Sequence, residues 1–485
     1  MKLATVILAA GLGTRMKSGK AKVLHQLAGK ALINYPVDIS LALKADRTIA
    51  IVGHQSDKVA ELLQNNYGKQ VETAIQKEQL GTGHAVMSAE KALKKHKGLV
   101  LILSGDVPLL TKSTVAKLIK KVKQKKSPFG LVSAVLENPE GYGRVLRESK
   151  NKIQAIVENR DATSEQKLIC EANMGIYVAD AKFLFNQLKK VGTDNDQGEY
   201  YLPDLVRMAY ESGAGVVGIK ADPAETLGIN NRVQLAELGQ ILRQRILEKL
   251  MLKGVTIIDP QSTYIDADVK IKADTTIEPN CHIKGNTKIG SNCTIGTGSI
   301  IESATIGNDV QVKPYTIIEE SKVDQGAILG PYSHLRPMSH IGSECHVGNF
   351  VETKKTTLKP GAKANHLSYL GDAVIGKKTN IGAGTITCNY DGYNKFATTI
   401  GDEVLVGSDT QLIAPISIPD RVVLGAGTSL ANAEGVEKGD LVITRPEVVV
   451  VKGFRDKLEN SAKKKKKKST KNNCNFETRI ESCAE

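Results

Sequence analysis

Hydrophobic residues follow different patterns in the two halves of the chain. Within residues 1–229, short apolar runs alternate with stretches in which apolar residues recur every three or four positions. The runs at 5–8, 48–53, 99–106 and 130–137 predict buried strands, and the spacing at 34–44 and 57–65 predicts helices. This alternation is typical of a mostly parallel sheet covered by helices on both faces. The first half is therefore predicted to be an α/β domain.

A single helix is predicted next. Aliphatic residues recur at three- and four-residue spacing through residues 230–251, and Gly254 follows them. This is the pattern of an amphipathic helix that ends near a glycine. We interpret residues 230–254 as a helical linker between two domains.

From residue 255 to about residue 450 the period changes to six. Aliphatic residues recur at Ile265, Ile271, Ile277 and onward to Leu430. Hexapeptide repeats of this kind wind a parallel β-helix with one short strand per repeat. Cys281, Cys293 and Cys345 all hold the small fifth position of a repeat, where the side chain points inward. We interpret these cysteines as core residues, not as metal ligands or nucleophiles.

Two features of the repeats are candidates for function. Residues 353–374 and 384–399 interrupt the period, and loops that leave a regular solenoid are where functional residues collect. His334, His340 and His346 hold the sixth position of successive repeats, which predicts a histidine ladder on one face. Stacked imidazoles are able to bind a metal. Because no acidic residue shares their register, an exposed corner or an interface is the favoured interpretation.

Composition narrows the class of protein. Aromatic residues are only 4% of the chain and tryptophan is absent, so the core must be built from aliphatic side chains. No apolar run reaches the ~18–20 residues that cross a bilayer, and seven cysteines without paired spacing suit a reducing compartment. The amino-terminal "MKLATVILAAG" has the length of a short signal peptide, but the glycines and cations that follow favour a first strand. We therefore expect a cytoplasmic protein without membrane insertion.

The net charge of +14 is partly carried by the end of the chain, where six lysines stand at 463–468. Residues 451–485 are predicted to be a basic, disordered tail, because they show no periodicity. The remaining positive charge is spread along the chain, which is compatible with phosphorylated substrates. No nucleic-acid partner is expected.

Candidate chemistry begins with "LAAGLGTRMKSGKAKVLH", residues 8–25, which follows the first predicted strand. A dinucleotide-binding fingerprint is excluded, because Met16 stands where that motif needs its third glycine. The backbone N–H groups of residues 10–13 are able to approach an oxyanion closely, and Arg15 and Lys22 add positive charge. Asp106 ends another predicted strand, a position where aspartate often only caps a helix.

The motifs of the chain, taken together and in order, carry a resemblance. They are "LAAGLGTRMKS" with Lys22, "QLGTGHA", "GDVPL", "GYGRV", "VGNFVE", "HLSYLGDA", "NIGAGTITCNYDG" and "VGSDTQL". The chain resembles, over roughly residues 3–450, the bacterial family of bifunctional enzymes that are both glucosamine-1-phosphate N-acetyltransferases and N-acetylglucosamine-1-phosphate uridylyltransferases. The resemblance implies a Rossmann-like nucleotidyltransferase domain, a left-handed β-helix, a homotrimer and UDP-N-acetylglucosamine as the product, for cell-wall and lipopolysaccharide synthesis.

For the first domain, the resemblance implies transfer of UMP from UTP. Arg15 and Lys22 would neutralise charge as the α-phosphorus is attacked and pyrophosphate leaves, and Asp106 and Asn230 would hold Mg²⁺. The residues implied to contact UDP-N-acetylglucosamine are Leu8, Ala9, Ala10, Gly11, Lys22, Gln76, Gly81, Thr82, Gly143, Glu158, Asn173 and Asn230.

For the second domain, the resemblance implies that His366 is the general base of acetyl transfer from acetyl-CoA and that Glu352 orients it, since a neutral histidine suits proton removal near pH 7. The residues implied to bind the glucosamine phosphate are Arg336, Lys354, Tyr369 and Asn380. Those implied to bind acetyl-CoA are Ala383, Asn389, Tyr390, Ser408, Ala426 and Arg445.

Two positions depart from the family pattern: Ser104 stands where an aromatic residue is expected, and Met174 where a small hydroxyl residue is expected. Two other functions fit parts of this pattern. A uridylyltransferase whose β-helix is only a trimerising stalk would not need His366 or the interrupted repeats. A non-catalytic sensor of sugar nucleotides would not need to keep Arg15, Lys22 and Asp106.

Overall fold

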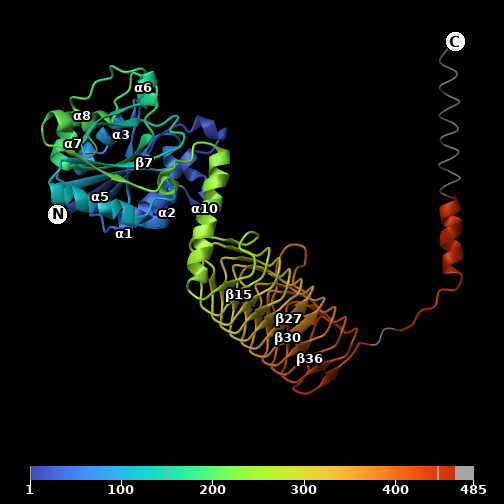
Figure 1. The fold of residues 1–485 in the computed structure, drawn as a ribbon. Coiled ribbons are helices and arrows are strands. Elements are labelled where there is room, and N and C mark those ends of the chain that lie inside the picture. The colour runs from blue at the N-terminus through green and yellow to red at the C-terminus, as the bar shows by residue number, and fades with distance from the viewer. Residues whose placement is uncertain (1, 150–151, 445–446, 465–485) are drawn as a thin grey trace, which may run out of the picture.

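The structure is a computed structural model that describes residues 2–149, 152–444 and 447–464. An α/β domain is followed by a long helix and then by a β-helix (Figure 1). In the part of the chain that the structure describes, no helix is long and apolar enough to cross a lipid bilayer.

A sheet of nine strands forms the centre of the first domain. Its main path runs β11-β7-β10-β6-β1-β4-β5. All neighbours along this path are parallel, except that β10 is antiparallel to both β6 and β7. The prediction of a mostly parallel sheet is confirmed. The strands are β1 Lys2–Ala9, β4 Arg47–Val52, β5 Glu72–Ile75, β6 Gly98–Ser104, β7 Phe129–Val135, β8 Arg144–Ser149, β9 Lys152–Val157, β10 Glu171–Asp180 and β11 Val216–Lys220.

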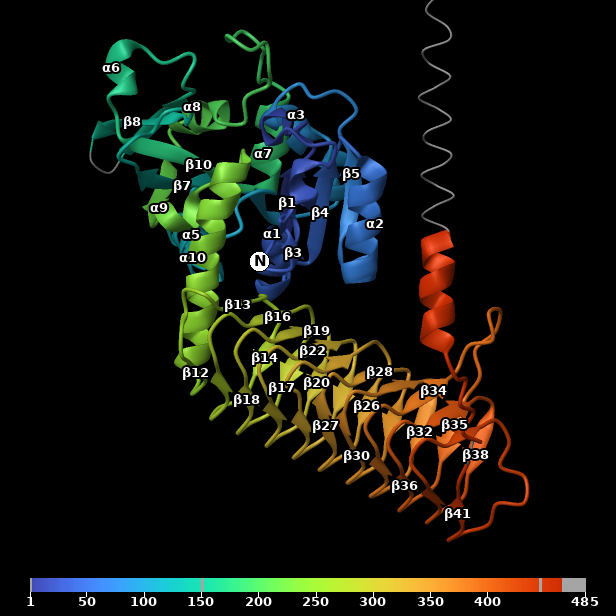
Figure 2. The same ribbon diagram turned by 90° about the vertical axis from the view of Figure 1, so that its right-hand side faces the viewer.

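Helices cover both faces of this sheet (Figures 1 and 2). Helix α5 illustrates why the sequence folds locally as it does: the Thr111 hydroxyl accepts the Thr114 N–H at its start, and Val115, Leu118 and Val122 are buried at helical spacing. The helices are α1 Asn34–Ala42, α2 Ser56–Tyr67, α3 Thr82–Met87, α4 Glu90–Leu93, α5 Lys112–Lys125, α6 Ser164–Lys167, α7 Ala181–Leu188, α8 Asp204–Glu211, α9 Pro223–Thr226 and α10 Arg232–Met251. A short hairpin, β2 Gln26–Leu27 and β3 Lys30–Ala31, lies outside the sheet.

The β-helix has three faces, and each face is one parallel sheet built from strands of successive coils (Figure 2). The first contains β12 Thr256–Ile257, β15 Thr276–Ile277, β18 Thr294–Ile295, β21 Gln311–Val312, β24 Ile328–Leu329, β27 His346–Asn349, β30 Lys363–His366, β33 Asn380–Ile381, β36 Leu405–Val406, β39 Val423–Leu424 and β41 Leu441–Val442. The second contains β13 Tyr264–Ile265, β16 His282–Lys284, β19 Ile300–Glu302, β22 Ile317–Glu319, β25 His334–Leu335, β28 Glu352–Lys354, β31 Tyr369–Gly371, β34 Ile386–Cys388, β37 Gln411–Ile413 and β40 Ser429–Leu430. The third contains β14 Lys270–Ile271, β17 Lys288–Ile289, β20 Thr305–Ile306, β23 Lys322–Val323, β26 His340–Ile341, β29 Thr357–Leu358, β32 Ala373–Ile375, β35 Thr398–Ile400 and β38 Ile416–Ile418.

The aliphatic residue of each repeat points into the β-helix, as the period of six predicts. Ile277, Ile295 and Ile318 are fully buried, and they belong to one continuous core. Cys281, Cys293 and Cys345 are also inside, at 0–1% exposure, which confirms that they are core residues. Burial raises the pKa of the Cys281 and Cys345 thiols to about 11, so neither is a thiolate near neutral pH.

The predicted histidine ladder is wrong. His334, His340 and His346 lie on the second, third and first sheets respectively, so they occupy three different faces. The reason is that one coil contains three repeats, and residues 17 or 18 apart stack, whereas residues six apart are on neighbouring faces. Two of these histidines do have acidic partners: His334 Nε2 is 3.0 Å from Glu319 Oε2, and His340 Nε2 is 2.7 Å from Asp324 Oδ2.

The predicted interruption at residues 353–374 is also wrong. Strands β28 to β32 continue the β-helix through this segment. Thr353 and Ala364 take the inward positions there and are fully buried, so the core continues although the aliphatic pattern does not. At 384–399 the excursion is real but shorter than predicted, because β34 and β35 flank only residues 389–397.

The carboxyl-terminal segment differs in part from the predicted disordered tail. Residues 454–464 are helical and exposed, and this helix stands apart from the β-helix (Figure 1). The lysines at 465–468 and the remainder of the predicted tail lie outside the described residues.

Candidate active sites

The first candidate site lies where the chain order of the α/β sheet reverses. Strand β1 has β4 on one side and β6 on the other, so the connections leave toward opposite sides of the sheet. Leu8 at the end of β1 is paired with Ser104 at the end of β6, and the Gly105 N–H donates to the Leu8 carbonyl at 2.9 Å. Ligands of open α/β sheets bind at such switch points, outside the carboxyl ends of the strands.

Two adjoining cavities of about 290 and 220 Å³ open at this edge. Both are lined by Leu8, Thr82, Ser104 and Asp106. The larger is also lined by the predicted residues Ala9, Ala10, Gly11, Lys22, Gln76 and Gly81. The smaller is also lined by the predicted residues Gly143, Glu158, Asn173 and Asn230. The structure therefore brings together every residue predicted to contact UDP-N-acetylglucosamine.

A charged cluster connects the two cavities. The Lys22 ammonium donates to Asp106 Oδ2 and, at 3.3 Å, to Asn230 Oδ1. Arg15, which lines neither cavity, donates through Nη2 to the same Asn230 oxygen at 3.0 Å. The side chains of Lys22 and Asp106 are each only 17% exposed. Two cations and the two oxygen atoms that accept their hydrogen bonds thus meet at one point between the cavities.

The oxygen atoms of Asp106 and Asn230 are suitable ligands for a magnesium ion. Asp106 supplies a carboxylate and Asn230 an amide oxygen, and both already face one cationic group, the Lys22 ammonium. Mg²⁺ prefers oxygen ligands and usually takes one or two from the protein, with water and substrate phosphates completing its shell. Among the described residues, no group of three or more His, Cys, Asp or Glu side chains gathers as a self-sufficient metal site. The donor set suits a metal that arrives with a phosphate ligand.

Glu158 is the strongly perturbed group of the smaller cavity. Burial raises the pKa of its carboxyl to about 7, and the carboxylates of Asp161, Asp204 and Glu199 add to the effect. Asn173 lies in the same cavity, where its Nδ2 donates to the Tyr177 hydroxyl at 2.6 Å. This cavity therefore offers a carboxyl group that keeps its proton to a higher pH than usual, and the larger one offers the Lys22 ammonium.

Several residues that the sequence analysis did not single out also line the two cavities. Gln79 donates to the Ala10 carbonyl at 3.2 Å, and Glu199 lies against Gly81. Tyr142 and Tyr177 line the smaller cavity. The polar stretch "DNDQGEYYLPD", residues 194–204, was an available signal for Glu199. The two departures from the family pattern, Ser104 and Met174, both line the smaller cavity.

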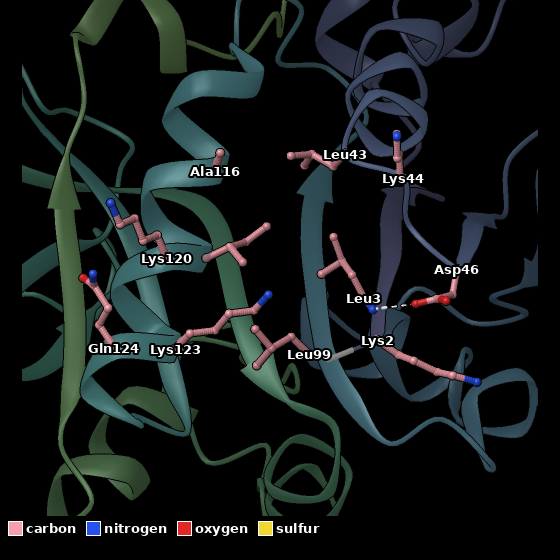
Figure 3. Close-up of a pocket in the computed structure, with 11 residues that line it drawn as sticks. Lys2, Leu3, Leu43, Lys44, Asp46, Leu99, Ala116, Lys120, Lys123 and Gln124 are labelled. Atoms are coloured by element: carbon pink, nitrogen blue, oxygen red, sulfur yellow. Dashed lines mark hydrogen bonds between the residues drawn. The ribbon is translucent and has the colours of Figure 1, made fainter.

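A larger cavity of about 710 Å³ lies at the opposite, amino-terminal edge of β1 and β6 (Figure 3). It lies beside Lys2, Leu3 and Leu99, and the α5 residues Lys120 and Lys123 face it. None of the predicted site residues lines this cavity. Cavity volume alone therefore does not identify the candidate active site of this domain.

The second candidate site is a corner of the β-helix, between the first and second sheets. His366 ends β30 and is paired with Asn349 of the preceding coil. The pairing of β30 with β33, β33 with β36 and β36 with β39 places Ala383, Ser408 and Ala426 at the equivalent positions of the next three coils. The predicted base and three predicted acetyl-CoA positions thus form one line along the corner, separated by single coils.

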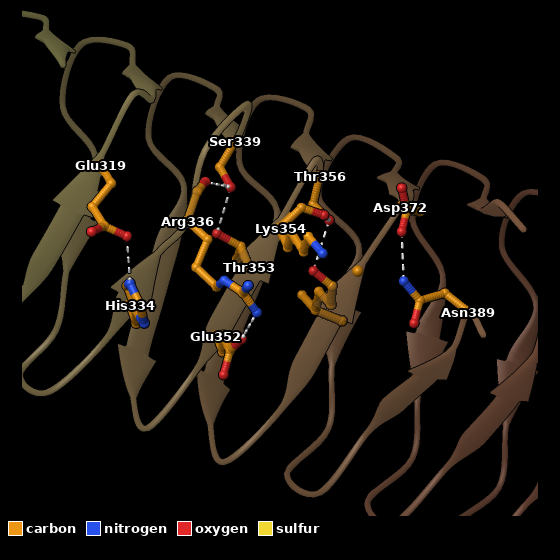
Figure 4. A network of polar contacts seen from close by, with 12 residues as sticks. Glu319, His334, Arg336, Ser339, Glu352, Thr353, Lys354, Thr356, Asp372 and Asn389 are labelled. Carbon is orange, nitrogen blue, oxygen red and sulfur yellow. Dashed lines mark hydrogen bonds and ion pairs between the residues drawn. The ribbon is translucent and has the colours of Figure 1, made fainter. Parts of the chain in front are cut away.

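Charged side chains of the second sheet, and of the turns that follow its strands, form a network of polar contacts (Figure 4). Arg336 Nη1 donates to Glu352 Oε1 at 2.7 Å, and Glu352 is stacked between His334 and Tyr369 in register. Within the described residues, the hydrogen bond of the Glu352 carboxylate is with Arg336, and none joins it to His366. The neighbouring Lys395 lowers the pKa of the Lys354 ammonium, because two like charges disfavour the charged form. Arg336, Lys354 and Lys395, which lie at the carboxyl ends of second-sheet strands or in the excursion that follows one, together make this part of the second sheet attractive to a phosphate.

Asn389 begins the excursion at 389–397, and its side chain is hydrogen-bonded to the preceding coil. Its Nδ2 donates to Asp372 Oδ2 at 2.5 Å (Figure 4). Gly371 permits this approach, because a Cβ there would lie 2.7 Å from Asn389 Nδ2 and 2.5 Å from the Tyr369 hydroxyl. Tyr390, the next residue, is exposed and pairs with Lys395 across the loop. Sequence reasoning missed Asp372 and Lys395, although both lie within or beside the quoted motifs.

Two predicted residues remain, Asn380 and Arg445. Asn380 lies at the start of β33, paired with Lys363 of the preceding coil. Arg445 lies outside the described residues.

The chain matches three family models. The nucleotidyl transferase model matches residues 4–222, the bacterial transferase hexapeptide (six repeats) model matches residues 268–303, and the hexapeptide repeat of succinyl-transferase model matches residues 397–431. These matches confirm the two kinds of domain that the sequence pattern predicts.

Relatives align with nearly the whole chain. The bifunctional protein GlmU of Geobacter sulfurreducens is 45% identical over 471 residues, which cover 93% of this chain and 98% of the relative. That of Pelobacter propionicus is 45% identical over 458 residues, covering 94% and 99%, and that of Anaeromyxobacter sp. strain Fw109-5 is 48% identical over 415 residues, covering 85% of each chain. The chain therefore belongs to the family of the bifunctional protein GlmU, as an enzyme that joins a uridylyltransferase domain to a hexapeptide-repeat acetyltransferase domain.

Proposed function

We propose that the paired cavities of the α/β domain bind UTP and N-acetylglucosamine 1-phosphate and join them into UDP-N-acetylglucosamine. The larger cavity of the pair, which is lined by Leu8, Gly11, Gln76, Gly81 and Thr82, binds the uridine nucleotide. The smaller cavity, with Gly143, Glu158 and Asn173, takes the acetylated sugar. The observation that carries this assignment is that the Lys22, Asp106 and Asn230 cluster connects the two cavities.

In this reaction a phosphate oxygen of the sugar phosphate attacks the α-phosphorus of UTP, and pyrophosphate leaves. Phosphoryl-type transfer depends mainly on positioning and on stabilising negative charge. The Lys22 ammonium and the Arg15 guanidinium supply that charge from the protein. Asp106 and Asn230 would hold Mg²⁺, which when bound neutralises phosphate charge further. Backbone N–H groups of residues 10–13 approach the phosphates where glycine leaves room.

The corner of the β-helix is proposed to acetylate glucosamine 1-phosphate. The glucosamine amine attacks the thioester carbon of acetyl-CoA, the C–S bond breaks, and CoA leaves as its thiol. His366 accepts the proton that the amine loses. Arg336 and Lys354 bind the sugar phosphate, and Tyr369 and Asn380 bind the sugar.

Acetyl-CoA is proposed to lie along the same corner. Ala383, Ser408 and Ala426 follow His366 at spacings of one coil, which is ~4.8 Å in stacked parallel strands. Asn389 and Tyr390 bind at the reacting end, and Arg445 remains a predicted contact. The Arg336–Glu352 hydrogen bond supports a role for Glu352 in holding the phosphate-binding arginine, and its predicted action on His366 stays a prediction.

We further propose that acetylation comes before uridylyl transfer, that the protein is cytoplasmic, and that it works as a homotrimer. Hexapeptide-repeat enzymes commonly form trimers, and the exposed corner that carries His366 leaves room for a neighbouring chain.

The test is an assay that follows two products separately. Wild-type protein, given glucosamine 1-phosphate, acetyl-CoA, UTP and Mg²⁺, is expected to release both free thiol and pyrophosphate. His366→Ala is expected to lose ~10²–10⁴-fold in thiol release, yet to release pyrophosphate normally when N-acetylglucosamine 1-phosphate is supplied. Thiol release that survives in His366→Ala would remove the proposed base. Absence of thiol release from wild type, with pyrophosphate release intact, would make the β-helix a stalk.

A further inference from the structure

The β2–β3 hairpin of the α/β domain contacts the first coil of the β-helix (Figure 2). The Ala28 carbonyl at its turn accepts the Ala267 N–H at 3.1 Å. The next turn residue, Gly29, has φ +77°, and a Cβ there would lie 2.4 Å from Asp266 Oδ2. The turn is therefore fitted against the β-helix without space for a side chain.

An ion pair joins the same two parts of the molecule. Lys30 Nζ lies 2.8 Å from Asp268 Oδ1 of the β-helix and 2.8 Å from Asp38 Oδ2 of helix α1. Only 19% of the lysine side chain is exposed, and the Tyr67 hydroxyl donates to Asp38 at 2.9 Å. Burial alone would lower the pKa of the Lys30 ammonium, but its hydrogen bonds to Asp268 and Asp38 raise it above the ordinary value. The Lys30 ammonium therefore stays charged near neutral pH.

The hairpin is continuous with the segment that carries Lys22. Residues Lys22–Leu24 form a short 3-10 helix, and β2 begins two residues later. The strand that leaves the hairpin bonds back to this segment: the Leu32 N–H donates to the His25 carbonyl at 3.0 Å, and the Ile33 N–H donates to the Val23 carbonyl at 3.1 Å. A shift of the hairpin therefore moves the backbone that carries Lys22.

Asn230 is tied to the β-helix by the other connection. It stands two residues before helix α10, which runs to the first coil, and Leu238 of that helix packs with Leu27 of the hairpin. Lys22 Nζ and Asn230 Oδ1 meet at 3.3 Å. The reacting centre, helix α10, the first coil and the hairpin thus form a closed ring.

We propose that Lys30 and Asp268 are positioning residues for uridylyl transfer, and that the first coil of the acetyltransferase domain thereby holds Lys22 against Asn230 and Asp106. This inference rests on the proposed role of Lys22 in the uridylyl-transfer site. It predicts that a residue of the β-helix sets the rate of the reaction in the other domain. A catalytic group displaced by about 1 Å can lower a rate up to ~10²-fold, and loss of one of several contacts that hold Lys22 is expected to lower kcat about tenfold.

The test compares Asp268→Asn with wild type in the full-length enzyme. Pyrophosphate release from UTP, N-acetylglucosamine 1-phosphate and Mg²⁺ is expected to fall about tenfold in kcat, with a smaller change in the KM for UTP. Thiol release from acetyl-CoA and glucosamine 1-phosphate is expected to stay at the wild-type rate. Asp268→Glu keeps the charge and is expected to recover most of the loss. Lys30→Met combined with Asp268→Asn is expected to be no slower than either single variant.

Asp274→Asn is the matched control, because Asp274 is an exposed carboxylate of the same part of the β-helix and is expected to leave both rates unchanged. Two results for Asp268→Asn would overturn the inference: pyrophosphate release at the wild-type rate, or an equal loss of both activities, which would indicate general damage to the fold. Failure of the proposed function is distinguishable, because wild-type enzyme would then release no pyrophosphate at all.

Discussion

Replacing Glu158 by glutamine tests the electrostatics of the 220 Å³ cavity that this residue lines. Burial raises the pKa of the Glu158 carboxyl from an ordinary value of 4.5 to about 7, with help from the carboxylates of Asp161, Asp204 and Glu199. The unfolded chain therefore releases this proton near pH 4.5, and the folded chain keeps it until about pH 7. Between these values the folded state binds more protons, so its stability falls as the pH rises. Glutamine, which never ionises, removes this effect.

The size of the effect follows from the two pKa values. At 1.36 kcal/mol for each pKa unit, the difference amounts to about 3 kcal/mol at most, fully developed above about pH 7. For a domain of 150–250 residues, 1 kcal/mol shifts Tm by roughly 2–4 °C, so we expect a change of roughly 6–12 °C.

The assay is thermal unfolding of wild type and Glu158→Gln at constant ionic strength, from about pH 4.5 to about pH 8.5. The Tm of the variant minus that of wild type is expected to grow by this amount as the pH rises. Glu165→Gln, at an exposed position in α6, is the control and is expected to show no such trend. A Tm difference for Glu158→Gln that is the same at both ends of the pH range would refute the reasoning.

Four other outcomes follow from the sites and the core. Chelation of divalent ions should stop pyrophosphate release and leave thiol release intact, and loss of both would contradict the assignment of Mg²⁺ to the first domain alone. Arg336→Lys should raise the KM for glucosamine 1-phosphate about tenfold in the thiol assay, since lysine cannot reproduce the planar guanidinium that binds Glu352. Asp372→Ala should lower kcat/KM for acetyl-CoA about tenfold by freeing the Asn389 amide, and an unchanged value would show that this amide needs no support. Ile318→Ala should cost about 2–5 kcal/mol by opening a cavity in the β-helix, detected as a lower Tm, whereas a Tm equal to that of wild type would mean that the core collapses around it.

Much of the candidate site could be predicted from the sequence because its residues stand in long, ordered motifs. The glycine-rich loop after the first strand and Asp106 after another strand are local features, and parallel strands bring such positions to one edge. In the β-helix, the family resemblance predicted six candidate site residues that stand in "HLSYLGDA" and "NIGAGTITCNYDG": His366, Tyr369, Asn380, Ala383, Asn389 and Tyr390. Asp372 and Lys395 were missed, because nothing local distinguishes a carboxylate that supports an amide from one that faces solvent.

The sequence by itself determined the two folds and the boundary between their patterns. The spacing of hydrophobic residues, at two, three to four or six positions, shows which side chains are buried. Each spacing is compatible with only one kind of backbone: a strand, a helix or a hexapeptide-repeat coil. The same reasoning failed where burial does not need a large aliphatic side chain, as at Thr353 and Ala364.

Only the tertiary structure decided which repeats share a face and which distant residues meet. His334, His340 and His346 look equivalent along the chain but lie on three faces, because a coil closes after three repeats. Lys22 meets Asn230 across 208 residues, and Lys30 meets Asp268 between the two domains. Contacts of this range leave no periodic trace, because they depend on how whole elements pack and not on the spacing of neighbours along the chain.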